Sequence, residues 1–197
     1  MDFDALDGPD VPEAIRQHCL ACIQYVHRAT GVVLDFTPDT LPVLDHHLAT
    51  AREATDDVKQ LVTLAAAAYF GEVVRRLYPA RWHCPEDDTD AWRLEFERCF
   101  LHFSPVAFAR EAIDARDAVE GGAGFSVAAD DLDVLRGALD VFGEVTAEDY
   151  YRLSTRIEVL GPLVDRLTAR ALTRGEDALA YTHEVYRHAL DEGDAPS

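Results

Sequence analysis

The sequence predicts an α+β protein in which helix predominates. In most of the chain, apolar residues recur three or four positions apart, which is the helical period. Between about residues 80 and 104 the pattern changes, and apolar residues alternate with charged ones as in a half-buried strand. The 197 residues are 48% hydrophobic and 28% charged, as in globular proteins. We therefore expect about seven helices around a small antiparallel sheet at residues 80–104.

The first helix is expected from Val11 to about Thr30. Asp10 can cap it, and Pro12 lies in the first turn, where a missing N–H does no harm. Gly31 provides the stop. One apolar stripe at helical spacing consists of Ile15, Cys19, Cys22, Ile23 and Val26.

Two further helices precede the sheet. The β-branched segment Val32–Phe36 is an extended link or an edge strand, a helix begins near Thr40, and another runs from Thr55 or Asp56 to Tyr78. Residues Leu61–Phe70 of this third helix are apolar all round, which predicts the buried centre of the domain. Gly71 inside it costs about 1 kcal/mol relative to Ala, so we expect a neighbouring element to approach closely there.

The sheet is predicted from three short segments. Arg81–Cys84 is the first strand, and the acidic run Glu86–Asp90 forms a polar turn. In the next segment Trp92, Leu94 and Phe96 alternate with charged residues. Cys99–Phe103 continues the pattern less regularly, so a bulge or a further strand near Arg98 is expected.

The chain returns to helices after the sheet. Ser104-Pro105 opens a helix to about Val119, and Gly121–Gly124 is expected to be a flexible connector. Proteases are expected to cut first there or at the termini. Gly161-Pro162 is expected to kink or break the path. The remaining helices are predicted at about residues 130–142, 146–160, 163–174 and 176–190.

Residues 11–190 are expected to form a single domain between a flexible acidic leader, residues 1–10, and a flexible tail, residues 191–197. No stretch approaches the about 20 apolar residues of a membrane-spanning helix. The N-terminus lacks the basic and apolar regions of a secretory signal. The sequence therefore predicts a cytoplasmic protein that does not bind membranes and forms no disulfides.

Acidic residues outnumber basic ones by 37 to 18, giving a net charge of −19 and a pI near 4.6. This charge disfavours binding to nucleic acids and to anionic lipids. Two explanations stay open. The acidity reflects a GC-rich genome or salt adaptation, or it attracts a protein with a basic face. If the charge attracts such a partner, the exposed turn Glu86–Asp90 is the best location for the binding surface. Asp87 and Asp88 are then the candidate partner-binding residues.

The cysteines provide the best metal candidates. Cys19 and Cys22 are three residues apart on the first helix, and His18 is four before Cys22. Cys84 and Cys99 could complete a four-ligand site. The alternative is that Cys19 and Cys22 are packing residues on the apolar stripe, since free cysteine is among the most buried residue types. We prefer this alternative and expect no metal and no cofactor.

Two other motifs have a chemical interpretation and a structural one. Glu72, on the most apolar helix, could be a buried general base, or it could pair with Arg75 or Arg76 one turn away. His183 and His188 are five residues apart, so they point about 140° apart on a helix and do not form the zinc-protease motif. We assign no catalytic residue.

The segment Leu61–Val74, with Ala-Tyr-Phe-Gly-Glu-Val at its end, precedes Arg81-Trp82. It resembles uncharacterised bacterial families of domains of unknown function, in which an Ala-Tyr-x-Gly-Glu-Val helix is followed by a small sheet that a Trp opens. The approach Leu34–Leu41 is also similar, and the resemblance covers about residues 32–105. It implies an α+β fold in a cytoplasmic protein and adds no catalytic residues.

The function expected from the sequence is that of a non-enzymatic interaction protein: an adaptor, a regulator or an immunity-type partner. The alternative is a metal-binding or hydrolytic enzyme that uses His18, Cys19 and Cys22, or Glu72. A concave pocket with convergent polar groups would favour the enzyme, and a flat or grooved patch would favour the interaction protein.

Overall fold

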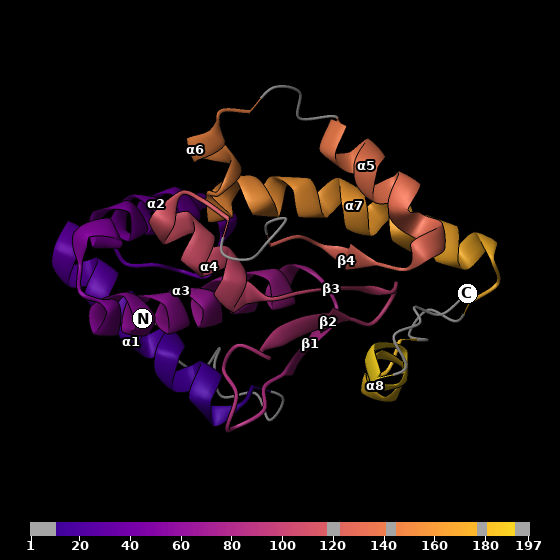
Figure 1. Ribbon diagram of the computed structural model, residues 1–197, viewed down its shortest axis with the longest axis horizontal. Coiled ribbons are helices and arrows are strands. Elements are labelled where there is room, and N and C mark those ends of the chain that lie inside the picture. The colour runs from indigo at the N-terminus through magenta and orange to yellow at the C-terminus, as the bar shows by residue number, and fades with distance from the viewer. Residues whose placement is uncertain (1–10, 118–122, 141–144, 177–180, 192–197) are drawn as a thin grey trace.

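The computed structural model describes residues 11–117, 123–140, 145–176 and 181–191 (Figure 1). The fold is predominantly helical with one small antiparallel sheet, as the sequence predicts. The helices are α1 (Glu13–Thr30), α2 (Leu41–Thr50), α3 (Asp56–Leu77), α4 (Pro105–Asp114), α5 (Leu132–Asp140), α6 (Ala147–Tyr150), α7 (Leu153–Thr173) and α8 (His183–Asp191), with short 3-10 turns η2 (Pro38–Thr40), η3 (Ala51–Glu53) and η4 (Ala129–Asp131). The strands are β1 (Ala80–His83), β2 (Arg93–Phe96), β3 (Leu101–Phe103) and β4 (Ser126–Val127).

The four strands form a meander in the order β1-β2-β3-β4, and each neighbouring pair is antiparallel. The sheet extends beyond the predicted range, because Ser126 and Val127 pair with His102 and Leu101. A two-residue strand has no alternation of its own that could reveal it. The segment Val32–Phe36 is an extended link, not a strand.

The strands divide their side chains between two faces. The apolar face carries Leu94 and Phe103, which are opposite each other in the register and almost completely buried. It packs on the helices: the Phe103 ring stacks on Phe108 of α4 at 5.0 Å and lies 5.9 Å from Phe70 of α3. The opposite face carries the polar residues of the same strands: Arg81, His83, Arg93, Glu95, His102 and Ser126.

Helix α3 lies at the centre of the helical body and contacts α1 and α4 most extensively (Figure 1). Its residues from Ala65 to Val74 are all buried, which confirms the second half of the predicted core segment Leu61–Phe70. The first half is wrong in part, because Leu61 is exposed and Val62 and Leu64 are only half-buried. The expected close approach at Gly71 is also confirmed. A Cβ atom at Gly71 would lie 2.2 Å from the indole ring of Trp82 in β1, so only glycine fits there.

Helix α7 continues through Gly161-Pro162, where the sequence predicted a kink or a break. Leu160, Leu163 and Val164 on both sides of the proline are buried, so packing offsets the hydrogen bond that Pro162 cannot donate. Asp45 of α2 caps the start of α7: its carboxylate accepts from the N–H of Leu153 at 2.8 Å. A residue distant in sequence thus sets where the helix begins.

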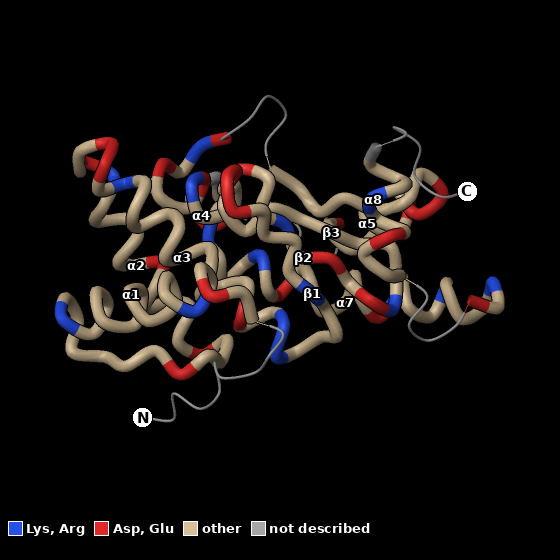
Figure 2. The backbone as a smooth tube through the Cα atoms, turned by 90° about the horizontal axis from the view of Figure 1, so that it is seen from below, with Lys and Arg blue, Asp and Glu red and all other residues tan. Residues whose placement is uncertain are grey.

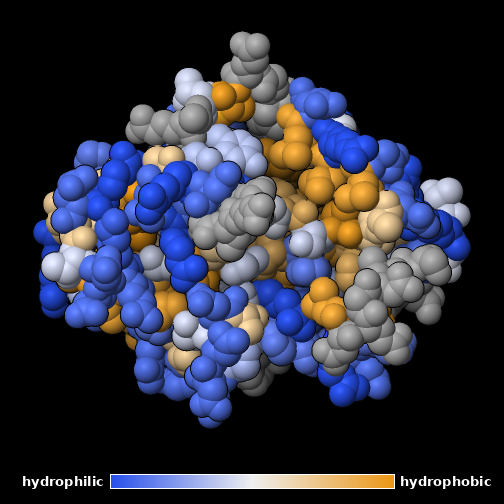
Figure 3. All heavy atoms as spheres, viewed as in Figure 1, coloured by the Kyte–Doolittle hydropathy of each residue, from blue (hydrophilic) through white to orange (hydrophobic). Residues whose placement is uncertain are grey.

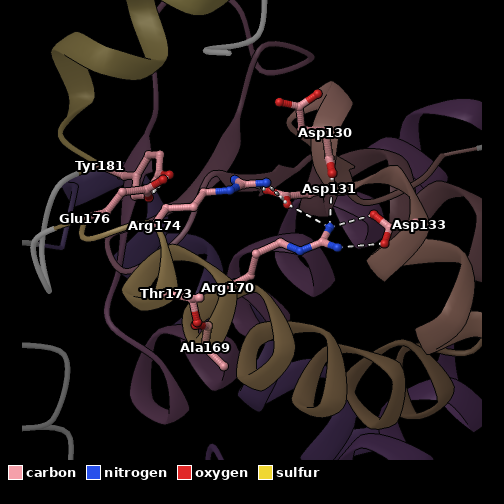
Figure 4. Close-up of polar contacts among 9 residues, drawn as sticks. All are labelled: Asp130, Asp131, Asp133, Ala169, Arg170, Thr173, Arg174, Glu176 and Tyr181. Atoms are coloured by element: carbon pink, nitrogen blue, oxygen red, sulfur yellow. Dashed lines mark hydrogen bonds and ion pairs between the residues drawn. The ribbon is translucent and has the colours of Figure 1, made fainter.

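Ion pairs join the end of α7 to η4 and to the start of α5 (Figure 4). Arg170 donates to both carboxylate oxygens of Asp133, at 2.6 and 2.8 Å, and to Asp131 at 3.2 Å. Arg174 donates to Asp131 at 2.8 and 3.2 Å. These contacts hold α5 alongside α7, as Figure 1 also shows.

Other predictions differ from the structure or lie outside it. Helix α4 ends at Asp114 because Ala115 adopts a left-handed conformation with φ of 49°, whereas the sequence predicted Val119. Three predicted flexible parts lie outside the described residues: the leader, residues 192–197 of the tail, and Gly121 and Gly122 of the connector. Ala123, which the predicted connector also includes, is buried. In the described part of the chain, no helix combines the length and apolarity needed to cross a membrane.

Candidate metal centre

The polar face of the sheet concentrates ionisable groups from three strands and a distant helix. In the strand register His83 is opposite Arg93, and Glu95 is opposite His102. Helix α8 adds His183 from its first residue. The alternation of β2 explains part of this arrangement, because Arg93 and Glu95 must share a face when Leu94 and Phe96 fill the core.

Glu95 is the centre of the cluster, and its side chain is completely buried. One carboxylate oxygen, Oε1, accepts from Nε of Arg93 at 2.8 Å. The other, Oε2, lies 2.9 Å from Nδ1 of His183. A buried carboxylate is costly unless charges or hydrogen bonds compensate it, and here each oxygen has a partner that can be cationic.

The two histidines lie side by side at this carboxylate. The rings of His83 and His183 stack with centroids 5.0 Å apart and planes inclined by 21°. One ligand atom from each of His83, Glu95 and His183 lies within 4.8 Å of the other two. Among the described residues this is the single group of three or more potential metal ligands that are so close.

The geometry is near that of a metal site. Ligand atoms that bind one ion at about 2.1 Å are about 3–3.5 Å apart, and the 2.9 Å between His183 and Glu95 already matches this spacing. Small side-chain rotations would bring in His83. Arg93 holds the second oxygen of Glu95 as the outer-shell groups of metal sites do. Side-chain exposure of 47% at His183 keeps the centre open to solvent.

Burial also affects the other histidines of the face. It lowers the pKa of His83, and the nearby Arg93 lowers it further. Burial, with a smaller effect of Arg93, lowers the pKa of His102 to about 4. His102 and His83 are therefore neutral near pH 7, and a neutral imidazole is the form that binds metals.

The cysteines predicted from sequence lie elsewhere. Cys19 and Cys22 are buried in the core between α1 and its neighbours, and burial raises the pKa of both thiols. His18 contacts the edge of Trp92. Cys84 is partly exposed and Cys99 is buried. The structure does not bring these residues together as a ligand group within the described part of the chain, and the packing interpretation agrees with their positions.

Glu72 has three hydrogen bonds in the core. Arg75 donates to both its oxygens, at 2.9 and 3.1 Å, and the indole N–H of Trp82 donates at 2.8 Å. This is the ion pair that the sequence offered as the alternative to a general base. It links α3 to β1 at the point where Gly71 admits the indole ring.

Asp87 and Asp88 are exposed in the turn between β1 and β2. Asp88 accepts from the backbone N–H groups of Asp90 and Ala91, at 3.0 and 3.2 Å, which shapes the turn. Their proposed role in binding a partner with a basic face stays a prediction.

Sequence reasoning missed His83, Glu95 and His183 as a group. His83 and Glu95 are 12 residues apart, and His183 is another 88 residues away, so no local spacing identifies them. In the sequence His183 lies near His188 of the same helix, whereas in the structure its neighbours His83 and Glu95 are on the sheet. The one available signal was the alternation of β2.

Comparisons with known proteins identify no relative. No family model, no curated protein and no solved structure matches the chain. The resemblance of residues 32–105 to bacterial domains of unknown function therefore stays a prediction.

Proposed function

We propose that this protein binds a divalent transition-metal ion through His83, Glu95 and His183. The observation that carries the proposal is the close approach of His183 and Glu95, at 2.9 Å, beside the stacked ring of His83. Two imidazoles and a carboxylate suit zinc and its neighbours in the first transition row better than magnesium or calcium. Metal binding at His83, Glu95 and His183 is the function proposed here. It replaces the metal site of His18, Cys19 and Cys22 that the sequence offered as an alternative.

The proposed site has the ligand number of a reactive centre. Structural zinc sites have four protein ligands, whereas catalytic ones have three and leave a position for water or another molecule. His83, Glu95 and His183 supply three. The exposed side of His183 gives an external ligand access to the ion.

The test is a metal titration of the full chain. Protein freed of metal with a chelator is titrated with Zn²⁺ by calorimetry and with Co²⁺ by visible absorption, which reports the number and type of ligands. We expect one ion per chain, with nitrogen and oxygen ligands and no thiolate absorption. His183→Ala should weaken binding by about 100-fold or more, since even outer-shell changes cost 10–100-fold.

The matched control is His188→Ala. His188 is exposed on the same helix and is not part of the ligand group, so this variant should bind like the parent protein. Equal affinity in His183→Ala and the parent would refute the proposed site. Cobalt–thiolate absorption would instead favour the cysteines.

A further inference from the structure

A groove of about 630 Å³ is lined by residues of strands β2, β3 and β4 and of helix α4. Arg93, His102 and Ser126 line it from the sheet, and Arg110 lines it from α4. Its volume falls in the range of small-molecule sites. Since Arg93 also holds Glu95, the groove lies directly beside the proposed metal centre.

The two arginines of the groove have donors to spare. Arg93 uses Nε for Glu95, and Arg110 uses Nη2 for Asp90 at 2.8 Å. Within the described ranges their other guanidinium nitrogens make no hydrogen bond. A guanidinium carries five N–H donors and pairs best with a planar carboxylate.

His102 also has polar atoms that the protein leaves unused in the described residues. Its ring makes edge contacts with Phe100 and Tyr186, and neither ring nitrogen has a hydrogen-bond partner among the residues that the structure describes. The hydroxyl-bearing Ser126 is opposite His102 in the register. A ligand in the groove can therefore find polar partners that the protein itself does not use.

The groove also has apolar lining. Ala91, Ala107 and Leu190 line it beside the polar groups and are at least partly exposed, whereas Phe103 and Val106 are buried. Asp90 and Glu95 each neutralise one arginine, so the local charge is balanced within a chain of net charge −19. This balance admits one negative charge more readily than two.

We propose that this groove binds a small monocarboxylate with an apolar body, its carboxylate on Arg110 and Arg93 and its apolar part against Ala91, Ala107 and Leu190. The site goes beyond the proposed metal function, because the arginines and the apolar wall need no ion.

The test uses the full chain with a chelator present, so that its outcome does not depend on the metal site. Calorimetry and chemical-shift mapping follow titrations with 3-phenylpropanoate. The comparison ligands are its amide, which has the same shape without the charge, and phenyl phosphate, a dianion. We expect 3-phenylpropanoate to bind at least about tenfold more tightly than its amide, since hydrogen bonds to charged groups are the stronger ones. We expect it also to bind more tightly than phenyl phosphate, because the balanced local charge disfavours a second negative charge.

Substitutions on the exposed rim separate the groove from the rest of the surface. Arg110→Gln should weaken the binding of 3-phenylpropanoate by about tenfold or more. Asp90→Asn should strengthen it, because Asp90 competes for Arg110. Arg98→Gln, a matched change at an exposed arginine outside the groove, should leave it unchanged.

Three outcomes would overturn the proposal: no binding of 3-phenylpropanoate, equal binding of its amide, or an equal loss in Arg98→Gln and Arg110→Gln. Tighter binding of phenyl phosphate would replace the monocarboxylate with a phosphate ester. Loss of Zn²⁺ binding in His183→Ala with retained carboxylate binding would support both sites as separate features.

Discussion

At the scale of single residues, the contact between Gly71, Glu72 and Trp82 defines how the helical body meets the sheet. Gly71 leaves room for the indole ring, and Glu72 accepts the indole N–H at 2.8 Å. Arg75 neutralises Glu72 from one turn away. This arrangement gives a structural reason for Gly71, Glu72 and Trp82 at these positions.

Gly71→Ala should therefore destabilise the protein. The new Cβ would lie 2.2 Å from Trp82, and inserting a methyl group into a packed core costs about 1–3 kcal/mol. Urea unfolding followed by circular dichroism measures the change. Gly137→Ala is the control: its Cβ would meet only Arg166 Nη1 at 3.5 Å, and the helix should gain about 0.5–1 kcal/mol. Equal stability of Gly71→Ala and the parent would contradict the packing argument.

At the scale of elements, long-range contacts decide where helices begin and continue. The start of α7 is capped by Asp45, 108 residues earlier in the chain. Its interior keeps Pro162 because apolar neighbours on both sides are buried. The sequence predicted an interruption at this point, since proline is unfavourable inside an isolated helix.

Pro162→Ala should stabilise the protein by about 1–3 kcal/mol, because alanine restores the missing N–H and relieves the ring from the preceding turn. Pro105→Ala is the matched control. Pro105 is at the first position of α4, where proline is tolerated, so its replacement should change stability little. Differential scanning calorimetry of both variants tests this. A lower Tm for Pro162→Ala would mean that a bend at the proline is needed for packing.

At the scale of the whole molecule, acidic residues are distributed over all the described helices and do not form one block (Figure 2). Hydrophobic side chains gather on one face over α5 and β4 (Figure 3), and α5 carries the exposed residues Leu132 and Leu139. A net charge of −19 on this compact body implies self-repulsion.

The free energy of unfolding should therefore rise as NaCl increases from about 0.05 to 0.5 M, because salt screens repulsion between exposed charges. Urea titrations at each salt concentration measure the slope. Asp87→Asn combined with Asp88→Asn removes two exposed acids and should reduce the slope. Stability that falls with salt would show that the ion pairs, such as those of Arg170 and Arg174 with Asp131, outweigh the repulsion.

The amino-acid sequence by itself determined the helical class, the position of the first three strands and the core role of the middle of α3, because these follow from local periodicity and from the apolar run that ends at Phe70. It also indicated the close contact at Gly71. Only the tertiary structure decided the metal centre. His83, Glu95 and His183 meet because β1 and β2 pair in one register and α8 returns to the sheet. Such contacts join residues whose separation along the chain has no period, so local patterns cannot reveal them.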